Sequence, residues 1–168
     1  CADFGATITA APPFALDVAA RVERVRSSGK PLKLRLCLVG AEEILWMTQT
    51  EAARTFAPRG LTMEALTPAY GLAQATLAVT IDGLDTAPEY LDVDATALAA
   101  GRVEPVESDH PSARRLISTG DELRDVAVRI EPENGEIVVR STALGTRYFG
   151  NPELTDARFR DGELHTGD

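Results

Sequence analysis

Apolar residues in the first third of the chain recur with periods that predict alternating strands and helices. Residues 6–10 and 32–39 are short β-leaning runs, and the second becomes continuously apolar, as a strand in a covered sheet does. Helical spacing between the two runs predicts a helix whose apolar face packs inward. This face comprises Phe14, Val18, Val22 and Val25.

The next segment predicts a second helix and a return to the same sheet. Residues 40–43 turn the chain into a helix with glutamates in its first turn, and Arg54 lies in its last turn. Residues 61–67 and 75–81 are β-leaning, and residues 68–71 between them predict a turn. Strand–helix–strand–helix–strand order predicts an α/β fold with an open, mostly parallel sheet and flanking helices.

Beyond residue 82 the pattern changes. Residues 82–110 are polar and irregular, and we expect a surface excursion with one short helix near residues 95–100. Residues 126–131 alternate, residues 136–140 return, and Asn134-Gly135 between them favours a hairpin. The sequence therefore predicts an α/β subdomain over residues 1–110, followed by a small β-rich subdomain, a distorted barrel, over residues 111–168.

Composition narrows the function classes. The 168 residues carry a net charge of −9, which argues against sequence-independent nucleic-acid binding. No apolar run approaches the ~20 residues needed to span a bilayer, and no signal segment is recognisable, so a cytoplasmic location is expected. The chain begins with Cys1 rather than Met, which suggests a piece excised from a longer polypeptide. Cys37 lies in the apolar run and predicts a buried free thiol.

The last third holds the most specific passage, GEIVVRSTALGTRYFGNPELTDARFRDGELHTGD, over residues 135–168. Within it, Asn151 is placed to cap a short helix and Pro152 occupies the first helical position. In this order, its glycines, its aromatic cluster, Asn-Pro-Glu and the closing Thr-Gly-Asp resemble the adenylate-forming (AMP-binding) superfamily. The resemblance implies that Asp168 holds the ribose hydroxyls of ATP.

A second passage, LTPAYGLAQATLAVT over residues 66–80, is similar to the version of a family motif found in fatty acyl-AMP ligases and acyl-CoA synthetases. The resemblance implies that Tyr70 stacks on adenine and that Gly71 lets the chain pass close to the phosphates. It further implies that a third segment, Gly40-Ala41-Glu42, lines the adenine pocket. Residues 4–18 also resemble a ligase segment, and the implied carboxylic-acid contacts are Phe14, Ala69 and Ala73.

Two departures from the family pattern bear on activity. Gln74 stands where the family has a glutamate that helps to hold Mg²⁺. Also absent are the Ser/Thr/Gly-rich phosphate loop and the C-terminal domain with its catalytic lysine. We therefore assign no catalytic residue to this chain and expect it to be inactive without the remainder of the ligase.

The resemblance implies a reaction in which a carboxylic acid, most simply a fatty acid, and ATP give an acyl-adenylate and pyrophosphate. A carrier protein or coenzyme A then accepts the acyl group on a thiol. Two alternatives stay open: a degenerate ligase-like domain with a binding or assembly role, and a stable α/β module with a vestigial site. His110 is expected to be solvated and His165 to pack, and the sequence shows no Ser-His-Asp set or zinc pattern.

Overall fold

A computed structural model describes all residues 1–168, and the chain divides into two compact units. The first, here called the α/β unit, comprises residues 1–68 and 82–120. The second, the β unit, comprises residues 69–81 and 121–168. The division into subdomains 1–110 and 111–168, expected from the sequence, stays a prediction. No helix in the chain combines the length and apolarity that a membrane span requires.

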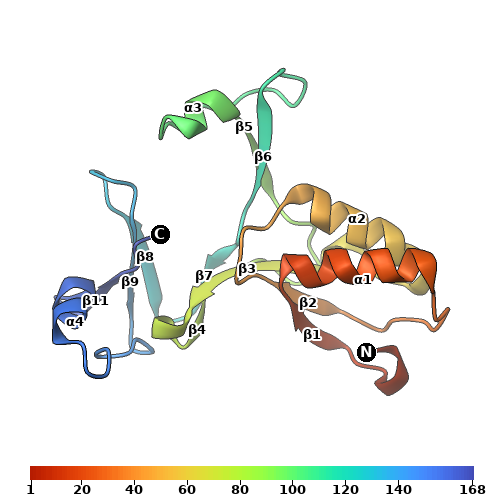
Figure 1. The fold of residues 1–168 in the computed structure, drawn as a ribbon, viewed down its shortest axis with the longest axis horizontal. Coiled ribbons are helices and arrows are strands. Elements are labelled where there is room, and N and C mark those ends of the chain that lie inside the picture. The colour runs from red at the N-terminus through yellow and green to blue at the C-terminus, as the bar shows by residue number, and fades with distance from the viewer. The chain divides into compact units, whose positions relative to one another are not determined.

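The α/β unit is built on parallel strands covered by two helices, as the sequence pattern predicts (Figure 1). Strand β1 (Ile8–Ala11) pairs in parallel with β2 (Leu36–Val39), and β2 pairs in parallel with the start of β3 (Leu66–Leu72). Helices α1 (Pro13–Val25) and α2 (Trp46–Phe56) pack side by side on one face of these strands. Their common core comprises Leu16, Ala20, Cys37, Val39, Ala52, Phe56, Leu61, Ala65 and Leu66.

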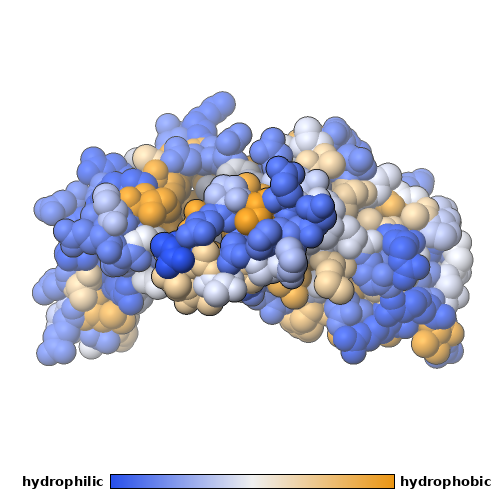
Figure 2. Space-filling model, turned by 90° about the horizontal axis from the view of Figure 1, so that it is seen from above, coloured by the Kyte–Doolittle hydropathy of each residue, from blue (hydrophilic) through white to orange (hydrophobic).

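The predicted orientation of α1 is wrong. The helix buries Leu16 and Ala20 against the sheet, and the stripe assigned to the core lies on the outside. The buried side comprises Pro13, Leu16 and Ala20, and the last two belong to the same core as Ala52 and Phe56 of α2. The exposed stripe, here called the α1 ridge, comprises Phe14, Val18, Val22 and Val25, whose exposed fractions range from 52% to 89%. Figure 2 shows apolar patches interrupting the hydrophilic surface on the face that it draws.

The α1 ridge predicts association of the isolated chain through apolar surface. We expect Val22→Lys to lower the binding of a fluorescent dye specific for apolar surface and to reduce self-association in sedimentation velocity. Ala19→Lys, which adds the same charge at an exposed position of the same helix, is the matched control. Equal dye binding and equal sedimentation for the two variants would contradict an adhesive α1 ridge.

Two further expectations, the start of the second helix and a turn at residues 68–71, are wrong. The glutamates at positions 42 and 43 precede α2 rather than forming its first turn, because the helix begins only at Trp46. Residues 68–71 lie inside β3 and do not form a turn. The burial of Cys37 is confirmed, and it raises the pKa of the Cys37 thiol to about 11.

The segment predicted as an irregular excursion, residues 82–110, contains the first strand of a hairpin. Strand β5 (Tyr90–Asp94) pairs antiparallel with β6 (Ala113–Ile117) in the α/β unit. The short helix expected near residues 95–100 is confirmed as α3 (Ala95–Ala99), and the Asp94 carboxylate caps it by accepting a hydrogen bond from Ala97 N at 2.7 Å. Single 3₁₀ turns occupy Ala2–Phe4, Ala57–Arg59, Met63–Ala65 and Ala73–Ala75.

The β unit contains two antiparallel arrangements and one short helix. The end of β3 pairs with β4 (Leu77–Ile81), which pairs with β7 (Asp121–Glu122). A separate open sheet has the order β10-β11-β9-β8, so no closed barrel forms. Its strands are β8 (Val126–Ile130), β9 (Ile137–Ser141), β10 (Phe159–Arg160) and β11 (Glu163–His165), and helix α4 (Pro152–Arg158) precedes β10.

Candidate functional site: a tyrosine–aspartate pair and its supports

Two residues from the two most specific sequence passages meet in the β unit. The hydroxyl of Tyr70 donates a hydrogen bond to Asp168 Oδ2 at 2.6 Å, although 98 positions separate them in the sequence. Partial burial and the hydrogen bond to Asp168 raise the pKa of Tyr70 to about 12. The phenol therefore stays protonated at neutral pH and remains a donor. Asp168 is exposed, and its carboxylate retains lone pairs for other donors.

The backbone around Asp168 is fixed by hydrogen bonds to the start of β9. Ile137 N donates to Asp168 O at 3.0 Å, and Thr166 N donates to Ile137 O at 3.2 Å. The Thr166 hydroxyl donates to the same Ile137 carbonyl at 2.7 Å and accepts from Asp168 N at 3.1 Å. The residue that resembles the ribose-binding aspartate thus lies on an ordered segment, and its side chain is free to face a ligand.

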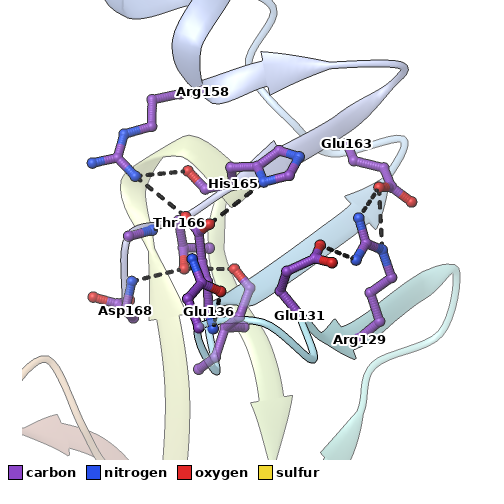
Figure 3. Close-up of polar contacts among 11 residues, drawn as sticks. Arg129, Glu131, Glu136, Arg158, Glu163, His165, Thr166 and Asp168 are labelled. Atoms are coloured by element: carbon purple, nitrogen blue, oxygen red, sulfur yellow. Dashed lines mark hydrogen bonds and ion pairs between the residues drawn. The ribbon is translucent and has the colours of Figure 1, made fainter.

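Glu136 is the centre of a second set of contacts behind this segment (Figure 3). Its Oε1 accepts a hydrogen bond from Gly167 N at 2.8 Å and lies 3.4 Å from Arg158 Nη1. Its Oε2 lies 3.5 Å from His165 Nδ1, at the outer limit of a hydrogen bond, and Arg158 Nη1 also donates to His165 O at 3.3 Å. Glu136 therefore holds the residue immediately before Asp168 and is a positioning residue for it.

The charge state of Glu136 supports this arrangement at neutral pH. Burial on its own would raise the pKa of Glu136, but the Gly167 N–H and the His165 ring outweigh it, and the pKa lies below its ordinary value of 4.5. A carboxyl whose pKa is lower in the folded state stabilises the fold above the ordinary value, and loses that effect as the pH falls through the lowered pKa. The contact to Gly167 is therefore intact throughout the neutral range.

Gly71 lies where two backbone segments approach closely. A Cβ atom at Gly71 would lie 1.6 Å from Leu77 O and 2.9 Å from Ala78 Cα, both backbone atoms of the neighbouring strand. The register between β3 and β4 shifts at Tyr70 and Gly71, which marks a β-bulge. Glycine is therefore required here for chain packing, independently of any ligand.

Gln74 is engaged by an aromatic residue from the loop before α4. Gln74 Nε2 donates to Tyr148 Oη at 2.8 Å, and Gln74 O accepts from Gly145 N at 2.7 Å. No group of three or more His, Cys, Asp or Glu side chains in the chain could hold a metal ion. One amide oxygen does not make an Mg²⁺ site, since that ion usually takes one or two carboxylates. The residues of this chain therefore do not fit Mg²⁺ by themselves.

The other predicted site residues are placed in two different units. In the α/β unit, Gly40, Ala41 and Glu42 follow the end of β2, and Glu42 Oε1 accepts a hydrogen bond from Phe14 N at 2.7 Å. Ala41 has a φ of 73°, in the left-handed region. In the β unit, Ala69 pairs with Ile81, and Ala73 begins the 3₁₀ turn that contains Gln74. Their assigned binding roles stay predictions.

The structure brings together a serine, a histidine and an aspartate that the sequence did not mark as a set. Ser112 Oγ lies 3.0 Å from His110 Nδ1 and donates to Asp94. The serine, not the histidine, is the middle member, so the histidine is not held between a nucleophile and a carboxylate as nucleophilic catalysis requires. The set completes the cap of α3.

Sequence reasoning missed Glu136 and Tyr148 as members of the site. Glu136 belongs to the recognised Gly-Glu-Ile passage, directly before β9, and this position in a family passage could have marked it. For Tyr148 the signal was weaker, since an aromatic residue in a glycine-rich loop has many possible partners. Both contacts join segments that lie 31 or 74 positions apart.

Comparisons with known proteins agree with these motifs. No protein-family model matches the chain. The chain is 34% identical to the long-chain-fatty-acid–AMP ligase FadD32 of Mycolicibacterium smegmatis, over 95% of this chain and 27% of that protein. It is 31% identical to a 4-hydroxyphenylalkanoate adenylyltransferase of Mycobacterium tuberculosis, over 92% of this chain and 27% of that protein.

Solved structures show the same fold. A fatty acid AMP ligase from Legionella pneumophila matches with a TM-score of 0.89 and 28% identity, over 99% of this chain and 32% of that chain. The adenylation domain of a keto acid-selecting peptide-synthetase module, bound to keto acyl adenylate, matches with a TM-score of 0.86 and 26% identity, over 34% of its length. The chain therefore spans about a quarter to a third of the proteins it matches. By sequence and by fold, it belongs to the adenylate-forming superfamily, as a part of such an enzyme similar to fatty acyl-AMP ligases.

Proposed function

We propose that this chain supplies nucleoside-binding residues to an ATP-dependent ligase that activates a carboxylic acid as an acyl-adenylate. The observation that carries the proposal is the contact between Tyr70 and Asp168, which joins the aromatic and acidic residues of two family passages. The similarity to acyl-AMP ligases over nearly the whole chain supports it. In the reaction, a carboxylate oxygen bonds to the α-phosphorus of ATP while the bond to the bridging oxygen breaks and pyrophosphate leaves.

The residues of this chain bind and orient the nucleoside in this proposal. The Tyr70 ring offers a stacking face to adenine, and such stacking is worth ~1–3 kcal/mol per base. The Asp168 carboxylate accepts hydrogen bonds from the ribose hydroxyls while the Tyr70 phenol holds one of its oxygens. Glu136 fixes the backbone of Gly167 and so the position of Asp168. No group of this chain takes up or delivers a proton.

The relatives support a proposal about the substrates. FadD32 is a long-chain-fatty-acid–AMP ligase, so we propose a fatty acid as the carboxylate and ATP with Mg²⁺ as the nucleotide. The Mg²⁺ would enter with the phosphates, because the chain has no carboxylate cluster for it. We further propose a carrier-protein thiol or coenzyme A as the acyl acceptor, reaction in the cytoplasm, and dependence on the parts of the ligase that supply the phosphate loop and the lysine.

A second function is favoured by one observation. Gln74 donates to Tyr148 and carries no charge, whereas the resemblance places an Mg²⁺-holding glutamate at this position. A domain that binds nucleotide or assembles with a partner without turnover would tolerate this change. The amide is nearly isosteric with a carboxylate, so the fold does not distinguish the two functions.

Carboxylate-dependent exchange of pyrophosphate into ATP by the complete protein tests both functions. We expect fatty acids to support exchange and Gln74→Glu to raise the rate by about tenfold or more, which is about 1.4 kcal/mol of barrier. The physical reason is the restored negative charge beside the metal–triphosphate pair. Tyr148 can then donate to the new carboxylate, so the local contact is preserved.

The control is Ala19→Glu, which adds the same negative charge at an exposed position of α1 in the α/β unit. Robust exchange by the native protein with no gain from Gln74→Glu would show an ordinary ligase. Nucleotide binding without exchange in either form would favour the binding domain. If the complete protein shows neither nucleotide binding nor exchange, the proposed function is wrong.

A further inference from the structure

The hairpin formed by β5 and β6 contacts the segment that immediately follows Gly40-Ala41-Glu42. Leu116 of β6 forms an isolated antiparallel bridge with Leu45. The Arg114 guanidinium makes an ion pair with the Glu43 carboxylate, 71 positions away. Both contacts lie within the α/β unit, and they join the hairpin to the turn between β2 and α2.

A more deeply packed contact lies beside these two. The Arg115 guanidinium makes two hydrogen bonds to Asp92, Nε to Oδ1 at 2.8 Å and Nη2 to Oδ2 at 2.6 Å. Its central carbon lies 3.7 Å from the centroid of the Tyr90 ring and 5.1 Å from that of Trp46, the first residue of α2. The two rings pack against each other with centroids 5.0 Å apart. Arg115, Asp92, Tyr90 and Trp46 are called the Arg115 cluster.

The geometry of the Arg115 cluster depends on arginine. A planar guanidinium can bind a carboxylate with two parallel hydrogen bonds and stack on an aromatic ring at the same time, whereas a lysine ammonium can do neither in this way. The Arg115 side chain is 25% exposed and the Asp92 side chain 10% exposed, so water competes weakly for the pair. The hairpin is therefore held firmly against the start of α2.

The segment Gly40-Ala41-Glu42, which precedes the residues held by the hairpin, needs such support. Ala41 has a φ of 73°, a strained conformation that a non-glycine residue keeps only where its surroundings enforce it. The enforcing contacts come from two sides. Glu42 accepts the hydrogen bond of Phe14 N at the start of α1, and residues 43–46 bind the hairpin.

We propose that the hairpin β5–β6, through the Arg115 cluster, positions the adenine-contacting segment Gly40-Ala41-Glu42. The inference rests on the proposed function, in which these residues line the adenine pocket. It adds four positioning residues: Trp46, which continues the segment into α2, Tyr90 and Arg115, which pack on Trp46, and Asp92, which binds Arg115. This hairpin, whose first strand lies in the segment predicted as an irregular excursion, thereby affects nucleotide affinity.

The test compares Arg115→Ala with the native complete protein. We expect faster amide hydrogen exchange at residues 40–46. We further expect the KM for ATP in pyrophosphate exchange to rise about five- to tenfold, with kcat changed by less than about twofold. The reason is that misplaced adenine contacts weaken binding without altering the reacting groups.

Two variants make the test specific. Arg102→Ala removes an exposed ion pair with Glu104 in the same unit and does not touch the cluster, so we expect native behaviour. Arg115→Lys keeps the charge without the planar fork, and we expect it to restore at most part of the ATP affinity. A merely structural loss would lower the amount of active protein, and so the apparent kcat, without raising the KM.

The outcomes separate this inference from the proposed function. A raised KM for ATP together with faster exchange at residues 40–46 supports the inference. A native KM for ATP in Arg115→Ala overturns it and leaves the ligase assignment standing. A native protein that binds no ATP overturns the proposed function itself.

Discussion

Replacing Gly71 with alanine is expected to destabilise the protein by about 3 kcal/mol or more, at the upper end of what overpacking costs. The new Cβ would lie 1.6 Å from Leu77 O and 2.7 Å from Leu77 C. These are backbone atoms of the paired strand, so no side-chain rotation can relieve the overlap. Strands β3 and β4 would have to separate, and the bulge that places Tyr70 would be lost.

Urea unfolding and hydrogen exchange over residues 66–81 measure this effect. Gly145→Ala is the matched control in the same unit, because its Cβ would meet only ordinary contacts, 3.7 Å to Gln74 O and 3.9 Å to the Phe159 ring. We expect Gly145→Ala to stay near native stability. If Gly71→Ala is as stable as Gly145→Ala, the close approach of the two strands is incorrect.

Removal of the Asp168 carboxylate is expected to weaken ATP binding by roughly one to two orders of magnitude. The reason is the loss of hydrogen bonds from the ribose hydroxyls to a charged acceptor, each worth ~1.5–3 kcal/mol. Calorimetry on the complete protein measures the change for Asp168→Ala. Because Tyr70 would lose its acceptor at the same time, Tyr70→Phe is needed as a control that keeps the ring and removes the contact.

Substrate analogues isolate the ribose contribution. The native protein should bind 2′,3′-dideoxy-ATP about as weakly as Asp168→Ala binds ATP, and Asp168→Ala should not distinguish the two nucleotides. Glu136→Gln should give a smaller loss, since it leaves Asp168 in place and weakens only the charge-assisted contact to Gly167 N. Equal affinity of the native protein for ATP and the dideoxy analogue would contradict ribose binding by Asp168.

Signals that act over a few residues were read correctly from the sequence. Asn151 caps α4 by accepting from Leu154 N at 3.0 Å, and Pro152 stands at its first position. The Asn134-Gly135 turn joins β8 and β9 as predicted. These features depend on local dihedral preferences and on capping groups within three residues. The same holds for the two family passages, whose residue order identified the superfamily before any contact was known.

Features that depend on distant partners were not readable in the same way. The pairing of β5 with β6 joins segments separated by residues 95–112, and neither strand has a strong pattern of its own. Residues 68–71 have the composition of a turn, yet they lie in β3 because Pro68 pairs with β2 and residues 69–71 pair with β4. The Arg115 cluster and the Glu136 contacts likewise require the folded chain.

The sequence by itself determined the α/β class, the positions of α1, α2 and α4, and the residues that resemble a nucleotide site, because each is encoded by local order. Only the tertiary structure decided which side of α1 is buried, since a helix with apolar residues on two faces offers either one to the sheet. It also decided that Tyr70 and Asp168 meet, and that Glu136 holds the residue between Thr166 and Asp168. Those contacts span 98 and 31 positions, and only the pairing of the strands brings such distant groups within hydrogen-bonding distance.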